Sequence, residues 1–209
     1  TSFIRIVKYI SFFLSIFLPG IYVAVACFNP ELIPAKLLFS IAVSQRSTPL
    51  PLMLEAIFIT IIYEIVREAG LRLPRPVGHA VSLIGALVVG EAAVNAGIIG
   101  SPMVMVVAIT AISSFTIPLL YEPITVLRFI FIIIGGLFGI AGLALGLCVL
   151  LLNICSINTY GVPYAAMLSP YSKTLFMDGI IKRGWETLED DRVRLSELNG
   201  ANLKGDKNE

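Results

Sequence analysis

The sequence predicts an all-α, polytopic membrane protein with four to five transmembrane helices, an interfacial amphipathic helix and a short polar C-terminal tail. Of its residues 57% are hydrophobic and only 14% are charged, whereas soluble domains carry about a quarter charged residues. The mean hydropathy is +0.91, and about half of the charges follow Tyr164. We therefore expect a helical membrane domain over residues 1–163 and a polar tail over 164–209, with a disordered end.

The first apolar segment, Val7 to Phe28, has two interpretations. Arg5 and Lys8 at its entrance, with small residues at 24–26, are typical of a signal peptide. The run is longer than a signal core, however, and further apolar segments follow. We favour a retained transmembrane helix whose basic entrance lies in the cytoplasm.

The next two segments are harder to place. Residues 29–46 are amphipathic and too polar to span, so we expect a helix in the interface. Leu50 to Ala69 is apolar between Glu55 and Glu64, which lie on opposite faces of a helix, about 13 Å apart along its axis. A carboxylate in hydrocarbon costs on the order of 3 kcal/mol. The segment is therefore buried among other helices, lines water or is tilted along the surface. For Glu64, Arg67 and Glu68 we favour a solvated helix end, whereas this interpretation fits Glu55 less well.

The topology depends on this ambiguous segment. If Leu50 to Ala69 spans, the chain has five crossings and its tail lies outside. If it lies along the surface, there are four crossings and a cytoplasmic tail. The preference of basic residues for the cytoplasmic side favours five.

The central helix, Val77 to Ile99, carries polar side chains within an apolar run. Its polar positions are His79, Glu91 and Asn95, and Glu91 lies one turn from Asn95 on the same face. Polar groups at bilayer depth face protein or water and are functional candidates. With Glu55 they form our candidate set for an ion pathway or intramembrane polar site, although for His79 we favour an interfacial hydrogen-bonded role over proton handling.

Small residues mark two candidate packing surfaces, since they allow helices to approach closely. On the central helix they fall four apart, at Gly78, Ser82, Ala86 and Gly90. In the apolar span Phe129 to Leu152 they form one straight stripe of Gly135, Gly139, Gly142 and Gly146. We interpret this stripe as an assembly surface, within the chain or between chains, and expect a homo-oligomer. Between the two surfaces, Ser101 is the predicted N-cap and Pro102 the first residue of the next helix, which makes an antiparallel hairpin with the central helix.

The sequence makes no case for an enzyme, a cofactor or a metal site. It has one histidine and three cysteines without metal or redox spacing, and the motifs of zinc proteases, serine hydrolases and P-loops are missing. The net charge of +1 gives no reason to expect nucleic acid. The partner that composition does predict is membrane lipid.

Five stretches follow one another in the order of a known family. They are FLPGIYVA (Phe17 to Ala24), NPELIP (Asn29 to Pro34), EIVREAGLRLPRPVGHAVS (Glu64 to Ser82), SPMVMVVAITAISSFTIP (Ser101 to Pro118) and YGVPY (Tyr160 to Tyr164). On these stretches the chain resembles the membrane domain of the A subunit of GerA-type spore germinant receptors. The match departs from the family at His79, where many relatives have Gln, and is weak over Tyr121 to Val126.

The resemblance implies one component of a multi-subunit complex, with B-type and C-type subunits, in the inner membrane of the bacterial spore. Such a complex answers small nutrients by releasing ions and starting germination. The family's N-terminal soluble domain is absent and the chain begins with Thr, so we expect a fragment or a processed product.

Two hypotheses for the function follow. In the first, the chain contributes to an oligomeric ion pathway near Glu91, Asn95 and Glu55. In the second, it is a non-conducting scaffold that anchors partner subunits through the glycine stripe. A secondary transporter is a weaker third reading, because the sequence shows no internal repeat.

Overall fold

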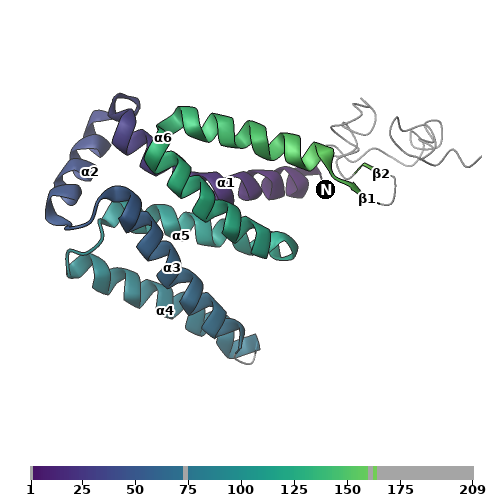
Figure 1. Cartoon of the computed structure of the whole chain (residues 1–209). Helices are drawn as coiled ribbons and strands as arrows, with labels where there is room; N and C mark the ends of the chain where they lie inside the picture. The colour runs from purple at the N-terminus through teal and green to yellow at the C-terminus, as the bar shows by residue number, and fades with distance from the viewer. Residues whose placement is uncertain (1, 73–74, 160–161, 164–209) are drawn as a thin grey trace, which may run out of the picture. The chain divides into compact units, whose positions relative to one another are not determined.

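The computed structural model describes residues 2–72, 75–159 and 162–163. The described chain is almost entirely helical (Figure 1), so the all-α prediction is confirmed. Its α helices are α1 (Ser2–Phe28), α2 (Ala35–Ser47), α3 (Leu52–Leu71), α4 (Arg75–Asn95), α5 (Ser101–Phe115) and α6 (Tyr121–Ser156). Single 3₁₀ turns, Pro30–Leu32 and Pro118–Leu120, precede α2 and α6. The expected polar tail, residues 164–209, lies outside the described residues.

The described chain divides into two compact units. Residues 10–144 form one of them and contain the polar side chains and the cavity described below. In the other, the strands β1 (Asn158–Thr159) and β2 (Val162–Pro163) pair antiparallel.

Proline and glycine set the helix boundaries. Pro49 stops α2 and Pro51 precedes α3, so the two helices meet at a bend of 81°, because the residue before a proline avoids helical geometry. Past the end of α4, Gly97 adopts a left-handed conformation (φ 66°) that suits glycine. Gly100 is then the N-cap of α5, one residue earlier than the sequence predicts, a shift within the usual uncertainty of helix ends.

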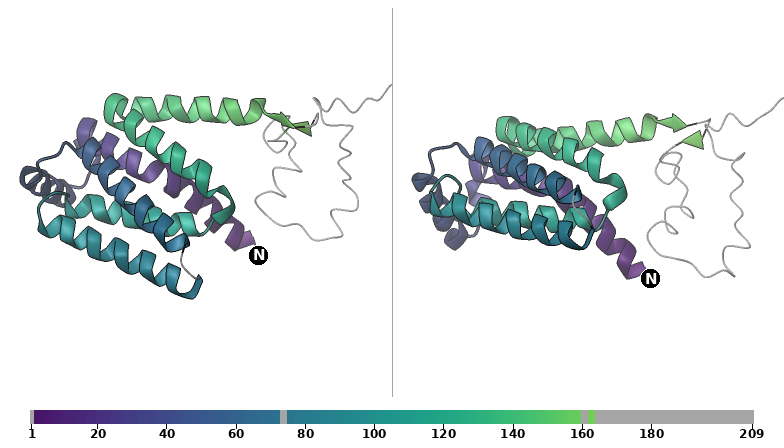
Figure 2. Two further views of the ribbon diagram at one scale, coloured as in Figure 1. Left: turned by 60° about the horizontal axis from the view of Figure 1, so that its bottom comes forward. Right: turned by 90° about the horizontal axis from the view of Figure 1, so that it is seen from below.

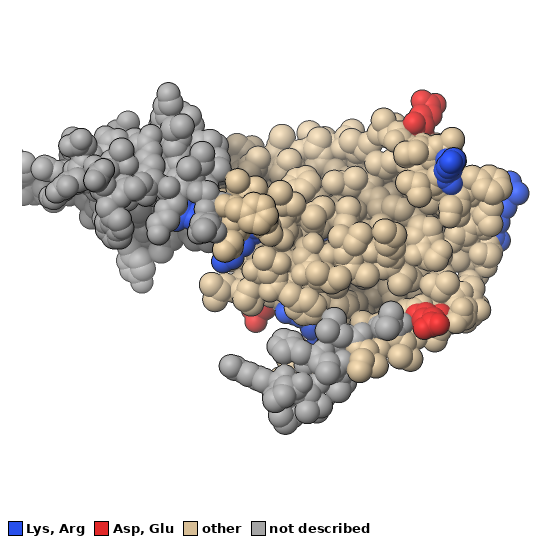
Figure 3. Space-filling view, turned by 180° about the vertical axis from the view of Figure 1, so that it is seen from behind, with Lys and Arg blue, Asp and Glu red and all other residues tan. Residues whose placement is uncertain are grey.

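The helices match the predicted apolar segments, and the membrane class is confirmed. Two stretches, Phe3–Phe28 and Pro118–Ser156, are long and apolar enough to cross a bilayer, and the bent α2–α3 pair makes a third candidate. Ile84–Asn95 and α5 are shorter apolar helices. One face of the molecule is almost uncharged, with its few charged side chains at the margins (Figure 3). The number of crossings stays a prediction.

The core of the unit formed by residues 10–144 lies where α1, α3, α5 and α6 meet. Figure 2 shows α3, α4 and α5 side by side. The buried apolar side chains of this core are Val23, Leu52, Ala56, Ile59, Tyr63, Ala93, Ile99, Met103, Val107, Ala111 and Ile132. Val23 of α1 is fully buried in this core, and the retention of the first helix stays a prediction.

Helices α1 and α6 cross at two glycines. A Cβ on Gly20 would lie 2.7 Å from the carbonyl oxygen of Phe131, and one on Gly135 would lie 2.6 Å from the carbonyl oxygen of Gly20. Both distances are shorter than a carbon atom allows. The first glycine of the predicted stripe therefore packs within the chain.

Helix α6 is broken at Gly139, so the prediction of a straight glycine stripe is wrong. Its φ of 64° and ψ of −152° lie in a region that essentially only glycine occupies. Because glycine is common in apolar transmembrane helices without breaking them, the spacing of the glycines alone does not predict this break. Past the break, Gly142 is buried against Phe138 and Ile134 of its own helix, whereas Gly146 is half-buried.

Candidate functional site

The outward face of α4 carries the polar pair that the sequence singles out. Ile84, Val88, Glu91 and Asn95 are all exposed, and their spacing of four, three and four residues places them on one face of the helix. Neither polar side chain has a hydrogen bond or an ion pair with another described residue. Within a single chain, this face is apolar apart from one carboxylate and one amide.

The acyl chains of lipids cannot satisfy that carboxylate. A carboxylate at bilayer depth costs on the order of 3 kcal/mol on insertion scales, so such groups face water or protein. Since no described residue pairs with Glu91, its partner must come from water, from a lipid head group, from another chain or from residues outside the described ranges.

Glu55 does not share this exposed face. Its side chain is buried, with 1% exposed, and its Oε1 accepts a hydrogen bond of 2.5 Å from the Gly100 N–H. The start of α5 is positive because its first N–H groups have no partner within the helix. A Cβ on Gly100 would lie 3.2 Å from the same carboxylate oxygen. Glu55 thus fixes the start of α5 to α3 through a charge-assisted hydrogen bond.

The small-residue ridge of α4 faces the protein where its side chains are described. Gly78 and Gly90 are buried, and a Cβ on Gly90 would lie 3.2 Å from Val104 of α5. Ala86 packs against the core. The side chains of His79 and Ser82 lie outside the described residues.

A buried polar cluster joins α1, α3 and α6, and sequence reasoning missed it. Glu64 accepts hydrogen bonds from the Tyr121 hydroxyl, from Thr125 Oγ1 (3.3 Å) and from Arg128 Nη1 (3.2 Å). The Nε of Arg128 donates to the carbonyl oxygen of Ser15 (2.8 Å). One carboxylate and one guanidinium therefore connect three helices.

Arg67 adds a second cation to this polar cluster. It is buried, with 8% exposed, and its guanidinium lies over the ring of Tyr121 and 5.7 Å from the ring centroid of Phe115. Four buried polar atoms have no hydrogen-bond partner among the described residues: Tyr63 OH, Arg67 Nε, Arg67 Nη1 and Arg128 Nη2. The cluster thus holds two guanidinium groups against the single carboxylate of Glu64.

The prediction of a solvated helix end is therefore wrong for Glu64 and Arg67. It holds for Glu68, which is exposed and pairs with Arg72 at 3.1 Å. One signal was available in the sequence: Arg128 stands beside the most apolar span of the chain, where an arginine needs a carboxylate partner.

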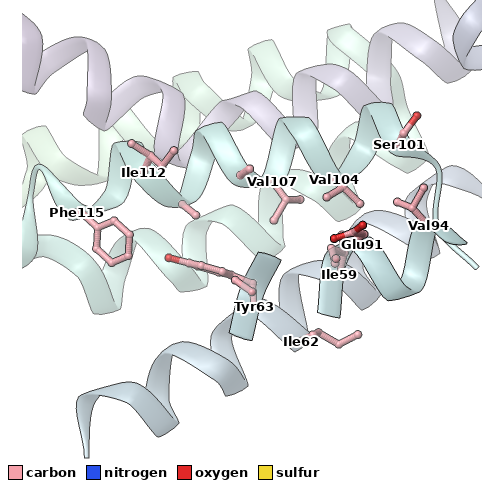
Figure 4. A pocket seen from close by; sticks show the side chains of 14 residues that line it. Ile59, Ile62, Tyr63, Glu91, Val94, Ser101, Val104, Val107, Ile112 and Phe115 are labelled. Atoms are coloured by element: carbon pink, nitrogen blue, oxygen red, sulfur yellow. The ribbon is translucent and has the colours of Figure 1, made fainter. Parts of the chain in front are cut away.

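An apolar cavity of about 440 Å³ lies between α3, α4 and α5. Figure 4 shows Glu91 and Ser101 toward one end of it and Phe115 toward the other. Among the described residues that line it, Glu91 is the only charged one, and the walls between are mainly aliphatic side chains such as Ile59, Val104 and Ile112.

The described residues contain no group of three or more His, Cys, Asp or Glu side chains that could hold a metal ion. Cys27, Cys148 and Cys155 are free thiols.

Comparison with known proteins identifies the family of this chain. The family described as Bacillus/Clostridium GerA spore germination protein matches residues 1–193. The chain belongs to this GerA family. The family resemblance carried by the five sequence stretches is thereby confirmed.

Individual GerA relatives cover most of the chain. Spore germination protein KA of Bacillus subtilis (strain 168) is 44% identical over 184 residues, which are 87% of this chain and 34% of that protein. The uncharacterized membrane protein YfkQ of the same strain is 39% identical over the whole of this chain and 41% of its own length. Spore germination protein GerLA of Bacillus cereus is 37% identical over 81% of this chain and 35% of its own length.

The chain thus spans roughly a third to two fifths of the length of these GerA relatives. No solved structure matches it.

Proposed function

We propose that this chain is the membrane part of a subunit of a nutrient-responsive spore germinant receptor, and that copies of it together form an ion pathway. The complex would include B-type and C-type subunits and would lie in the inner membrane of the spore. Membership of the GerA family supports the role in germination. The observation that carries the ion pathway is the exposed face of α4, where Glu91 and Asn95 stand among apolar side chains without partners in the described chain.

In an oligomer, the polar side chains on this face of α4 would have partners that a single chain does not give them. If several copies turn α4 toward a common axis, their Glu91 and Asn95 side chains meet water and one another instead of lipid. Rings of carboxylates attract cations, and amide oxygens replace part of an ion's water shell while still allowing it to leave. Glu55, which is buried against Gly100, would position α5 beside the pathway.

Replacing Glu91 with Gln tests the pathway, because the change removes the charge and keeps the shape. In spores that carry the full-length subunit, we expect nutrient-triggered cation release to slow by about fivefold or more, the equivalent of about 1 kcal/mol. Release would be followed by the cations in the medium, and assembly by co-purification of the partner subunits. The matched control is Glu122→Gln, an exposed carboxylate at the start of α6. Unchanged release from assembled Glu91→Gln complexes would exclude Glu91 from the pathway.

A second candidate function is a non-conducting scaffold, favoured by the glycines of α6. Gly135 and Gly139 are unsuitable positions for testing the scaffold, because Gly135 packs against Gly20 and Gly139 breaks the helix. Leucine at either position would damage the fold itself. Gly146 is half-buried and lies past the break, so it reports on assembly more cleanly.

The scaffold hypothesis predicts that Gly146→Leu separates the chain from its partner subunits in co-purification while the isolated chain stays folded. Close helix contacts depend on small residues, and leucine would hold the helices apart. Cation flux from liposomes that contain only the purified chain separates the two functions. The pathway predicts flux that Glu91→Gln lowers, whereas a pure scaffold predicts none.

A further inference from the structure

The apolar cavity between α3, α4 and α5 has the shape and charge of a lipid site. We propose that it binds one acyl chain of a phospholipid whose primary ammonium head group pairs with the Glu91 carboxylate. Phosphatidylethanolamine has this chemistry. The site belongs to a single chain and does not depend on whether an oligomer conducts ions.

The dimensions of the cavity fit a hydrocarbon chain. Its lining follows α5 from Ser101 to Phe115, about 21 Å at 1.5 Å per residue, which is most of the thickness of a bilayer core. A volume of about 440 Å³ spread over that length is too narrow for a helix, whose diameter with side chains is about 10–12 Å. One extended acyl chain fits where a helix of a second copy does not.

The polar end of the cavity selects the head group. An acyl chain gains little by leaving other lipid tails for an apolar groove, so the selectivity must come from the charged end. Glu91 is the only charged residue among the described residues of the lining, and Ser101 lies toward the same end (Figure 4). A carboxylate beside apolar walls attracts a cation more strongly than it would in water. A primary ammonium also donates three hydrogen bonds, whereas the phosphate of phosphatidylglycerol, which has no compensating cation, is repelled.

The deciding experiment measures bound lipids. The purified chain would be exchanged into equal amounts of phosphatidylethanolamine and phosphatidylglycerol with identical acyl chains, and retained lipids would be counted by native mass spectrometry. We expect phosphatidylethanolamine to be retained over phosphatidylglycerol by about fivefold, as for one partly exposed ion pair. Glu91→Gln should abolish this preference, and the control Glu122→Gln should keep it.

A second pair of variants tests the acyl chain. Ala108 lines the cavity, so Ala108→Phe should reduce retention of both lipids. Its neighbour Ile109 is absent from the lining, and Ile109→Phe should leave retention unchanged. If Ala108→Phe fails to fold, as judged by circular dichroism, the isosteric Glu91→Gln still decides the question.

Three results would overturn the proposal. They are equal retention of the two lipids by the unchanged chain, a preference that survives Glu91→Gln, and a dimer that carries no lipid. The last result would mean that a second copy covers the groove.

Discussion

At the scale of single residues, polar groups in this chain have sharply different roles, and sequence position alone does not separate them. Glu55 and Glu64 lie in the same helix, yet one accepts a backbone N–H of α5 and the other joins the side chains of α6. Glu91 has neither kind of partner among the described residues. Glu55, which is bonded to the start of α5, has a structural role, whereas Glu91, which has no bond to a described residue, is the better candidate for function.

The buried pair of Glu64 and Arg128 should contribute strongly to stability. Arg128 is 1% exposed, and Arg128→Met would remove its bonds to Glu64 and to the Ser15 carbonyl. Because hydrogen bonds to charged groups contribute about 1.5–3 kcal/mol each, we expect unfolding in detergent to become easier by about 2 kcal/mol or more. The measurement is the free energy of unfolding from a denaturant titration.

Two further variants serve as controls for this pair. Glu68→Gln removes the exposed pair with Arg72 and should change the stability by less than about 1 kcal/mol. In the double variant Glu64→Gln with Arg128→Met, the loss should be smaller than the sum of the single losses, because neither charge is left alone. Additive losses would show that the two side chains do not interact.

At the scale of one element, α6 is defined by its break. An unbroken helix of 36 residues would be about 54 Å long, nearly twice the thickness of a bilayer core. The break at Gly139 divides this length into two shorter helical parts. A Cβ at this position would also lie 3.0 Å from the ring of Phe28.

We expect Gly139→Ala to destabilise the chain by about 1–3 kcal/mol, the usual cost of a strained backbone conformation. The comparison is Gly146→Ala in the same helix, which should be neutral or stabilising because alanine favours the helix by up to about 1 kcal/mol. Thermal unfolding in detergent, followed by circular dichroism, measures both. Equal melting temperatures for the two variants would contradict a glycine-specific conformation at residue 139.

At the scale of the whole molecule, the sequence predicts the class and the helices better than the contacts between them. Hydropathy and helical spacing locate all six α helices because these properties are local. The contact of Glu64 with Arg128 joins residues 64 positions apart, and no local pattern encodes it. Two further partners of Glu64 in α6, Tyr121 and Thr125, fall in the stretch Tyr121 to Val126, where the family resemblance is weak.

The candidate site was predictable in the same measure. The pairing of Glu91 with Asn95 follows from helical spacing and lies on one exposed face, as expected. The burial of Glu55 depends on the distant turn before α5, and the cavity depends on three helices together. Neither of these features is contained in any single segment.

The bond between Glu55 and the Gly100 N–H also restricts how α5 moves. Any tilt of α5 that keeps this bond must pivot about Gly100, at the N-terminal end of the helix. The other end of α5, at Phe115, lies about 22 Å from Gly100 along the axis, so a tilt of about 10° moves it by roughly 4 Å. The largest displacement therefore occurs beside Arg67, whose guanidinium faces the Phe115 ring, while the Gly100 end stays in place.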